Sequence, residues 1–226
     1  MAVTDQAIAR IRTMIRTGEL APGSRLPPEK ELSEQLGLSR NSMREAIKAL
    51  EVMQVLTVRQ GDGTYVTSLD PRMLSDLFSF VIDVQGDASL ASLFAVRRLL
   101  EGETAAIAAR LMSDETIRRL FDVGEEAMRS TDKEVLMALD LEFHASLADA
   151  TGNPFLAAIL DSLSSESLRQ RNWDSIAATP HTLADVIVEH REIVEAIARR
   201  DPELARAAAV RHTAETERRL RVHTGA

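Results

Sequence analysis

Beyond residue 71, apolar residues recur at the spacing of one helix face along the rest of the chain. Steps of three and four residues predict amphipathic α-helices, and Gly, Pro, Ser or Asp residues between the runs predict where each helix ends. Seven such helices joined by short loops favour an antiparallel bundle. The expected helices span residues 72–84, 90–111, 114–129, 133–150, 154–171, 181–199 and 202–221.

The first part of the chain has a different pattern, in which short helices precede a β-rich hairpin. Ile8, Ile11 and Ile15 indicate a first helix, and a connection dense in Gly and Pro follows it. A second helix, a Gly-Leu-Ser turn and a third helix with Ser39 as its N-cap come next. Two β-rich runs around a Gly-Asp-Gly turn then predict a hairpin. The second helix is expected over about residues 29–35, and the strands over 55–58 and 64–66.

Helix, helix, turn, helix and hairpin is the order of a winged helix-turn-helix. A Thr-Ser-Leu-Asp-Pro segment after the hairpin is typical of a linker. The predicted fold class is therefore mainly α, with two domains. We expect a winged helix-turn-helix over residues 1–68 and an all-α antiparallel helical bundle over residues 69–226.

The net charge of -8 is unevenly distributed along the chain. The first 70 residues hold nine basic and nine acidic side chains, and the remainder holds 18 basic and 26 acidic ones. All the excess acid thus lies in the expected bundle, so the net charge does not exclude nucleic-acid binding by the first domain. The absence of cysteine excludes disulfides and thiolate metal sites. No run of 18 apolar residues indicates a membrane span, and a cytoplasmic protein is expected.

The third helix of the first domain is the expected recognition helix. In helix-turn-helix proteins, residues at the start of this helix reach base edges in the major groove. Arg40, Asn41 and Arg44 suit this role, because Arg pairs with guanine and Asn with adenine through two hydrogen bonds. Ser39 is expected to contact a phosphate. The alternative is a solvated helix face that binds nothing.

Two positions outside this helix complete the expected contacts with double-stranded DNA. Lys30 on the preceding helix is placed to meet a phosphate. Gly61 in the hairpin turn allows the backbone to approach the duplex closely, because it has no side chain.

The segments "GELAPGSRLP", "MREAIKAL" and "GDGTYV" resemble the winged-helix domain of GntR-family transcription regulators. The resemblance implies that Lys30, Arg40, Arg44 and Gly61 contact DNA. Lys30 stands where the family usually has Arg, and it offers a point charge instead of a fork. Gln54 stands where Gly commonly closes the recognition helix, although Gln tolerates a left-handed backbone poorly.

Within the expected bundle, one helix carries a polar pair on its apolar face. Asp140 and His144 are four residues apart, on the side that Leu136, Phe143 and Leu147 would bury. A buried carboxylate and a buried imidazole are costly unless each finds a partner. The pair therefore predicts further polar groups in the interior.

Two histidines on later helices are candidates for those partners. His190 and His212 each lie in an inward-facing row of apolar residues. With Asp140 and His144 they form a set of one carboxylate and three imidazoles, which suits zinc, nickel, iron or manganese. The alternative is a buried, hydrogen-bonded cluster without a metal ion.

Four segments over about residues 90–215 resemble the effector-binding domain of the FadR subfamily, called FCD: "VRRLLEGETAAIAARL", "DLEFHASLADATGNPFL", "EHREIVEAI" and "RRDPELARAAAVRHT". The resemblance implies that a divalent metal ion, zinc or nickel, is held by Asp140, His144, His190 and His212. It also implies that Arg97 meets the carboxylate of an effector. The spacing alone leaves a second interpretation of Arg97, an ion pair with Glu101 four residues later.

Together these features predict a homodimeric, sequence-specific transcription regulator, a repressor and not an enzyme. A two-fold dimer suits a pseudo-palindromic operator. A small organic acid bound at the metal site would control operator affinity. Three alternatives stay open: a metal-responsive regulator, a metal-dependent hydrolase, and a bundle that only dimerises.

Overall fold

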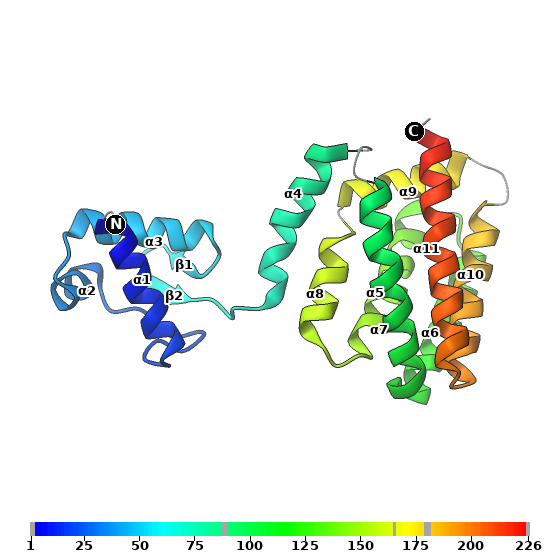
Figure 1. The fold of residues 1–226 in the computed structure, drawn as a ribbon, viewed down its shortest axis with the longest axis horizontal. Coiled ribbons are helices and arrows are strands. Elements are labelled where there is room, and N and C mark those ends of the chain that lie inside the picture. Colours follow the sequence, from blue (N-terminus) through cyan, green and yellow to red (C-terminus); the bar gives the residue numbers. More distant parts are fainter. Residues whose placement is uncertain (1–2, 87–89, 165, 179–181, 225–226) are drawn as a thin grey trace. The chain divides into compact units, whose positions relative to one another are not determined.

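The computed structural model describes residues 3–86, 90–164, 166–178 and 182–224 (Figure 1). They form two compact units, Met1–Met73 and Leu74–Ala226, which we call the head and the bundle. The sequence predicts that the first domain ends at residue 68. Whether residues 1–68 and 69–226 each fold independently stays a prediction. Among the described residues, no helix is both long and apolar enough to cross a bilayer.

The head is a three-helix unit with a two-stranded antiparallel hairpin, as the sequence predicts. In the hairpin, Leu56 lies opposite Val66 and Arg59 lies opposite Gly63. The core is apolar, and each helix contributes a fully buried side chain to it: Ile11 from α1, Leu32 from α2 and Leu50 from α3. The elements are α1 (Val3–Arg16), α2 (Glu29–Leu36), α3 (Arg40–Val52), β1 (Leu56–Arg59) and β2 (Gly63–Val66).

Local hydrogen bonds set both ends of α3. The Ser39 hydroxyl accepts the backbone N–H of Ser42 at 3.1 Å and caps the start of the helix, as predicted. The helix ends at Val52, and Gln54 takes a left-handed φ of 57°. This is the position where the resemblance leads one to expect Gly, so the chain here accepts a strained backbone.

The bundle contains eight α-helices in its described residues, one more than predicted. Figure 1 shows α5 and α11 lying side by side over most of their length. A short 3-10 turn, η1 (Pro71–Leu74), precedes the bundle. The helices are α4 (Ser75–Gln85), α5 (Leu90–Leu111), α6 (Asp114–Arg129), α7 (Lys133–Asp149), α8 (Pro154–Ser162), α9 (Glu166–Ala178), α10 (Thr182–Ala198) and α11 (Pro202–Thr224).

Small residues let α5 and α11 approach closely. A Cβ added at Gly102 of α5 would lie 2.8 Å from Cγ2 of Val210 on α11, so a larger residue would force the helices apart. Buried alanines line the same two helices, among them Ala105, Ala108, Ala109, Ala205 and Ala209. The close packing of α5 and α11 therefore sets the position of His212 on α11 relative to Arg97 and Glu101 on α5.

The prediction of one helix over residues 154–171 is wrong. Helix α8 ends at Ser162, whose hydroxyl donates to the carbonyl of Ala158 at 2.6 Å, and α9 begins at Glu166. Serine side chains compete for backbone hydrogen bonds, so the serine-rich segment favours a break that its apolar periodicity conceals. Helix α9 then continues to Ala178, with Trp173 buried. The break matters because α9 contributes residues to the candidate site.

Candidate metal centre

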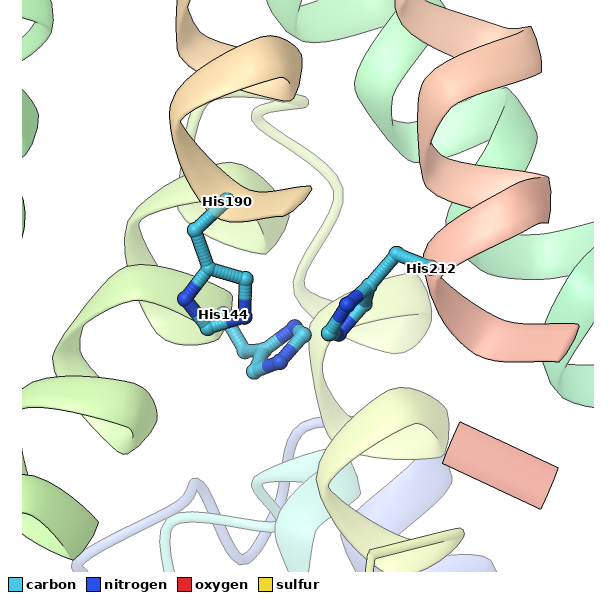
Figure 2. A group of neighbouring side chains, drawn as sticks. All are labelled: His144, His190 and His212. Atoms are coloured by element: carbon cyan, nitrogen blue, oxygen red, sulfur yellow. The ribbon is translucent and has the colours of Figure 1, made fainter. Parts of the chain in front are cut away.

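Three histidines from three helices meet inside the bundle (Figure 2). One ring nitrogen from each of His144 on α7, His190 on α10 and His212 on α11 lies within 4.8 Å of the other two. Asp140 lies beside them, with Oδ1 at 3.6 Å from Nε2 of His190 and 3.8 Å from Nε2 of His144. The structure thus brings together the four residues that the sequence marks as candidate ligands.

His190 is the member of this group whose environment is least complete. Its Nε2 is buried and has no hydrogen-bond partner among the described residues. The ring stacks on Phe143 with centroids 4.0 Å apart, so its orientation is held by packing. A buried nitrogen without a partner costs roughly 1–3 kcal/mol. Three imidazoles and a carboxylate are the donors of a four-coordinate site for an ion such as zinc, so the residues present fit a divalent metal.

The charge state of the imidazoles suits this role. Burial lowers the pKa of His144, although Asp140 and Glu101 act in the opposite direction. The pKa of His190 is well below its ordinary value because of burial and, next, the nearby His212 and His144. Both rings are therefore neutral near pH 7, and a neutral ring nitrogen can donate its lone pair to a metal ion.

A buried ion pair orients His212. The Nδ1 of His212 donates to Oε2 of Glu189 at 2.8 Å. Arg219 holds the same carboxylate through two hydrogen bonds of 2.9 and 3.0 Å. With Nδ1 carrying the proton, Nε2 of His212 is left as the acceptor for a ligand. Burial would raise the pKa of Glu189, but the hydrogen bonds from His212 and Arg219 lower it to about 2.

Glu189 and Arg219 are not among the residues predicted from the sequence. A signal was present, because Glu189 lies three residues after buried Val186 and four before buried Ile193, on the inward face of α10. Arg219 lies seven residues after His212 on α11, two helical turns along the same face. Charged residues at such positions need a buried partner, which periodicity alone does not identify.

Arg97 forms an ion pair with Glu101, which is the second of the two interpretations that the sequence left open. Its Nε donates to Oε1 of Glu101 at 2.7 Å, and both side chains are nearly buried. Glu101 also accepts from the Thr213 hydroxyl at 2.9 Å. Burial would raise the pKa of Glu101, but Arg97 and the neighbouring histidines lower it to about 2. Arg97 nevertheless also lines a cavity with His144 and His212.

This cavity, which we call the polar cavity, has a volume of about 50 Å³. That is room for a few water molecules or for the polar groups of a small ligand. Leu168, Arg169 and Asn172 of α9 contribute to its wall, and none of them is among the residues predicted from the sequence. The residues used below are Arg97, Asp140, His144, Asn172, His212 and Arg219.

The candidate DNA-contacting side chains lie on the surface of the head. Arg40, Asn41 and Arg44 are exposed along the start of α3, and Lys30 is exposed on α2. The Nε of Arg44 is 3.5 Å from Glu29, an exposed pair of little energetic weight.

Ser39 is exposed at the start of α3, where its hydroxyl also lies 2.9 Å from that of Ser42. Gly61 adopts a φ of 77° in the hairpin turn, a conformation that favours glycine. Arg25 supports this turn by donating to the backbone carbonyl of Asp62, a contact that the sequence did not reveal. The groups predicted to meet DNA are therefore exposed, on α2, at the start of α3 and in the hairpin turn.

A head of this kind joined to an all-helical domain with an interior polar site defines a class of DNA-binding regulators that sense small molecules. Comparison with known proteins identifies the family. The chain matches the family described as "Bacterial regulatory proteins, gntR family" over residues 3–66 and the FCD domain over residues 92–215. It therefore belongs to the GntR family and carries an FCD domain.

Individual relatives agree with this assignment. The chain is 30% identical to the HTH-type transcriptional regulator LutR of Bacillus subtilis, over 90% of this chain and 94% of that protein. It is 28% identical to the Galactonate operon transcriptional repressor of Escherichia coli, over 96% of each. The solved structure of Streptococcus agalactiae GntR superposes with a TM-score of 0.70 and 30% identity, covering 95% of this chain and 99% of that one. The protein is a DNA-binding transcription regulator and not an enzyme, so the hydrolase alternative is discarded.

Proposed function

We propose that the protein is a repressor whose operator affinity is controlled by a small carboxylic acid bound at a divalent metal ion, zinc or nickel, in the bundle. The observation that carries this proposal is the unpartnered Nε2 of His190, which lies among two further imidazoles and the Asp140 carboxylate. Repression, as opposed to activation, is supported by the similarity to the Galactonate operon transcriptional repressor of Escherichia coli.

Different contacts orient or position the four candidate ligands. His212 is oriented by Glu189, His190 by stacking on Phe143, and Asp140 lies within 4 Å of two of the imidazoles. His144 completes the set. When bound, the ion supplies a positive charge that attracts the carboxylate of the acid.

Arg97 is placed to hold a second oxygen of the acid. Its Nε is engaged by Glu101, so the guanidinium is oriented while its two terminal nitrogens are not used in that bond. A guanidinium fixed in this way recognises a carboxylate through a fork of N–H groups. The ion pair and the effector contact are thus compatible roles for Arg97.

The DNA side of the proposal rests on the exposed groups of the head. Arg40, Asn41 and Arg44 would contact bases, and Ser39 and Lys30 would contact phosphates. The wing would approach the duplex through its left-handed glycine at position 61. The acid changes operator affinity only if it binds the DNA-competent and DNA-incompetent arrangements of the protein differently.

A homodimer on a pseudo-palindromic operator is part of the proposal. Large apolar side chains remain exposed on α4, including Leu77, Phe80 and Val84 at 65%, 64% and 69% exposure. Several such residues on one eleven-residue helix are typical of an interaction surface. We propose that a second copy of the chain covers this surface of α4, because binding to a two-fold operator requires a dimer.

Metal content tests the proposal directly. Protein purified without a His tag and reconstituted with zinc or nickel should hold one ion per chain, and a chelator should lower its melting temperature. His190→Ala should abolish both effects and leave operator binding in place. His223→Ala, at an exposed position on α11, is the matched control and should behave as wild type. Wild-type protein that takes up no stoichiometric ion would refute the metal site and the effector mechanism together.

A metal-responsive regulator is the second candidate, favoured by the same three-histidine group. Fluorescence anisotropy with a labelled operator separates the two functions. Operator affinity that follows free metal concentration without any acid supports metal sensing. Release from the operator only when metal and an acid are both present supports the acid-controlled repressor.

A further inference from the structure

The hairpin of the head carries no net charge, although it is proposed to meet DNA. Its residues 56–66 include one basic side chain, Arg59, and one acidic side chain, Asp62. DNA presents a closely spaced row of phosphates, so a surface that lies against it gains affinity from each cation that it brings close. A neutral hairpin therefore depends on neighbouring segments for positive charge.

The connection between α1 and α2 runs beside the hairpin. The backbone N–H of Leu26 donates to the carbonyl of Thr64 on β2 at 2.8 Å. An antiparallel bridge also pairs Arg25 with Tyr65 on the same strand. The connection thus follows β2 as a short third strand, and this pairing fixes the point from which the Arg25 side chain extends.

The guanidinium of Arg25 lies at the turn of the hairpin. Its Nη2 donates to the backbone carbonyl of Asp62, the residue that follows Gly61. Gly63 leaves room for the group, because a Cβ built there would lie 2.6 Å from Nε and 3.1 Å from Nη2 of Arg25. A larger residue at position 63 would have to displace the guanidinium, so the glycine and the arginine fit each other.

Most of the hydrogen-bonding capacity of this guanidinium is left for an outside partner. The bond to Asp62 uses one terminal nitrogen, and Arg25 is an exposed residue. Its remaining N–H groups can donate to an oxygen outside the protein. A guanidinium matches a phosphate in shape and contacts it through two parallel N–H groups.

The carboxylate of Asp62 has a partner of its own. The Tyr65 hydroxyl donates to Oδ2 of Asp62 at 2.8 Å, and the guanidinium of Arg59 lies over the Tyr65 ring at 4.4 Å from its centroid. The hydrogen bond to Asp62 raises the pKa of Tyr65, so the hydroxyl keeps its proton at neutral pH. Arg25 thus holds the backbone of residue 62, whereas Tyr65 holds its side chain.

We infer that Arg25, which lies outside both the recognition helix and the hairpin, contacts a DNA phosphate beside the hairpin turn. It adds the positive charge that residues 56–66 lack, next to the turn where Gly61 is proposed to approach the duplex. A contact with the DNA backbone strengthens binding to all sequences. The inference rests on the part of the proposed function that concerns DNA, and it is independent of the metal ion and the acid.

Substitutions that separate charge from hydrogen bonding test the inference. Arg25→Gln keeps a donor for the carbonyl of Asp62 but removes the charge, whereas Arg25→Lys keeps both. Full-length protein without added metal or acid is titrated onto a fluorescent duplex of mixed sequence at several salt concentrations, and anisotropy gives the affinity. Arg25→Gln should bind roughly 3- to 10-fold more weakly. It should also reduce the slope of log affinity against log salt by about 0.9, the value for one phosphate contact.

Two further variants serve as controls. Arg25→Lys should keep the slope of wild type and lose no more than about twofold in affinity, because Lys meets a phosphate as a point charge. Arg10→Gln, at an exposed position on α1, controls for the loss of one positive charge and should leave the slope unchanged. Thermal unfolding of all these variants should match wild type, because both positions are exposed.

The outcomes separate this inference from the proposed DNA surface. An unchanged slope in Arg25→Gln overturns the inference. A slope that falls as much in Arg25→Lys as in Arg25→Gln overturns it too, since Arg25 would then only support the turn. Lys30→Ala, at the other proposed phosphate contact, is measured in parallel. If Lys30→Ala lowers the slope and Arg25→Gln does not, the inference alone fails, and if neither lowers it, the proposed DNA surface fails as well.

Discussion

The head and the bundle differ in how many charged side chains they bury. In the described part of the head, Ser33 is the one buried polar residue, and its hydroxyl donates to the carbonyl of Lys30 at 2.8 Å. The hydroxyl oxygen of Ser24 is the one buried side-chain atom of that part without a hydrogen-bond partner. The bundle buries Glu189, His212 and Arg219 in one connected network and leaves further polar atoms without partners. The polar network proposed to hold a ligand thus lies inside the bundle, whereas the side chains proposed to contact DNA lie on the surface of the head.

This difference predicts how mutations act in each part. Replacing an exposed residue of the head that is predicted to contact DNA should change binding with little effect on stability. Replacing a residue of the polar network should change both, because the network is also part of the bundle core. The following experiments test that contrast, in order of expected effect.

Glu189→Ala should have the largest effect, a loss of about 3–5 kcal/mol in the stability of the metal-free bundle. The substitution leaves the Arg219 charge buried without its carboxylate and removes the acceptor of His212. Urea unfolding measures the change. The control is Glu195→Ala on the same helix, whose side chain is 44% exposed and whose ion pairs with Arg191 and Arg199 are long. Similar losses in the two variants would contradict a stabilising role for the network.

Arg40→Ala and Arg44→Ala should each weaken operator binding by about 1–3 kcal/mol if these side chains contact bases. Their melting temperatures should match wild type, because both side chains are exposed. Lys30→Ala should weaken binding to all sequences and reduce the salt dependence, since a phosphate contact carries no sequence information. Arg10→Ala on α1 controls for the loss of one positive charge in the head. Unchanged operator affinity in both Arg40→Ala and Arg44→Ala, measured by anisotropy at fixed salt, would be inconsistent with base contacts.

The metal-free bundle should lose stability as the pH falls below about 6.5, the ordinary pKa of histidine. Burial lowers the pKa of His144 and His190 in the folded state. The unfolded chain then binds more protons than the folded one in the window below 6.5, so the free energy of unfolding decreases with falling pH. The head, which has no histidine, should show no transition in this window. Chemical unfolding at pH 7.5 and 5.5 measures both, and equal bundle stability at the two values would contradict neutral buried imidazoles.

Gln54→Gly should give the smallest effect, a gain of about 0.5 kcal/mol in the stability of the head. Relief of left-handed strain, roughly 1–2 kcal/mol, slightly exceeds the entropic cost of glycine, roughly 0.5–1 kcal/mol. Gln35→Gly is the control, because this exposed residue lies within helix α2 and should destabilise the head by about 1 kcal/mol. Thermal unfolding of the two variants should therefore shift in opposite directions, and a lower melting temperature for Gln54→Gly would show that the strain is not relieved.

The sequence by itself determined the features that depend on short-range interactions. The predicted cap at Ser39 is a hydrogen bond to a backbone N–H three residues away, so local composition is enough to predict it. The inward faces of the helices follow from their apolar period, which is why Asp140 and His144 could be recognised as unusual before any fold was known.

Only the tertiary structure decided which of these groups meet and what completes them. Glu189 and His212 are 23 residues apart, and their pairing depends on how α10 packs against α11. Helix α8 ends at Ser162 although the apolar period continues, and Asn172 of the separate helix α9 lines the cavity. Periodicity identifies the buried face of each helix but not the helix that packs against it. That pairing depends on how all the side chains of the interior pack together without voids. The polar network of the bundle is therefore a property of the packed core, in contrast to the surface of the head.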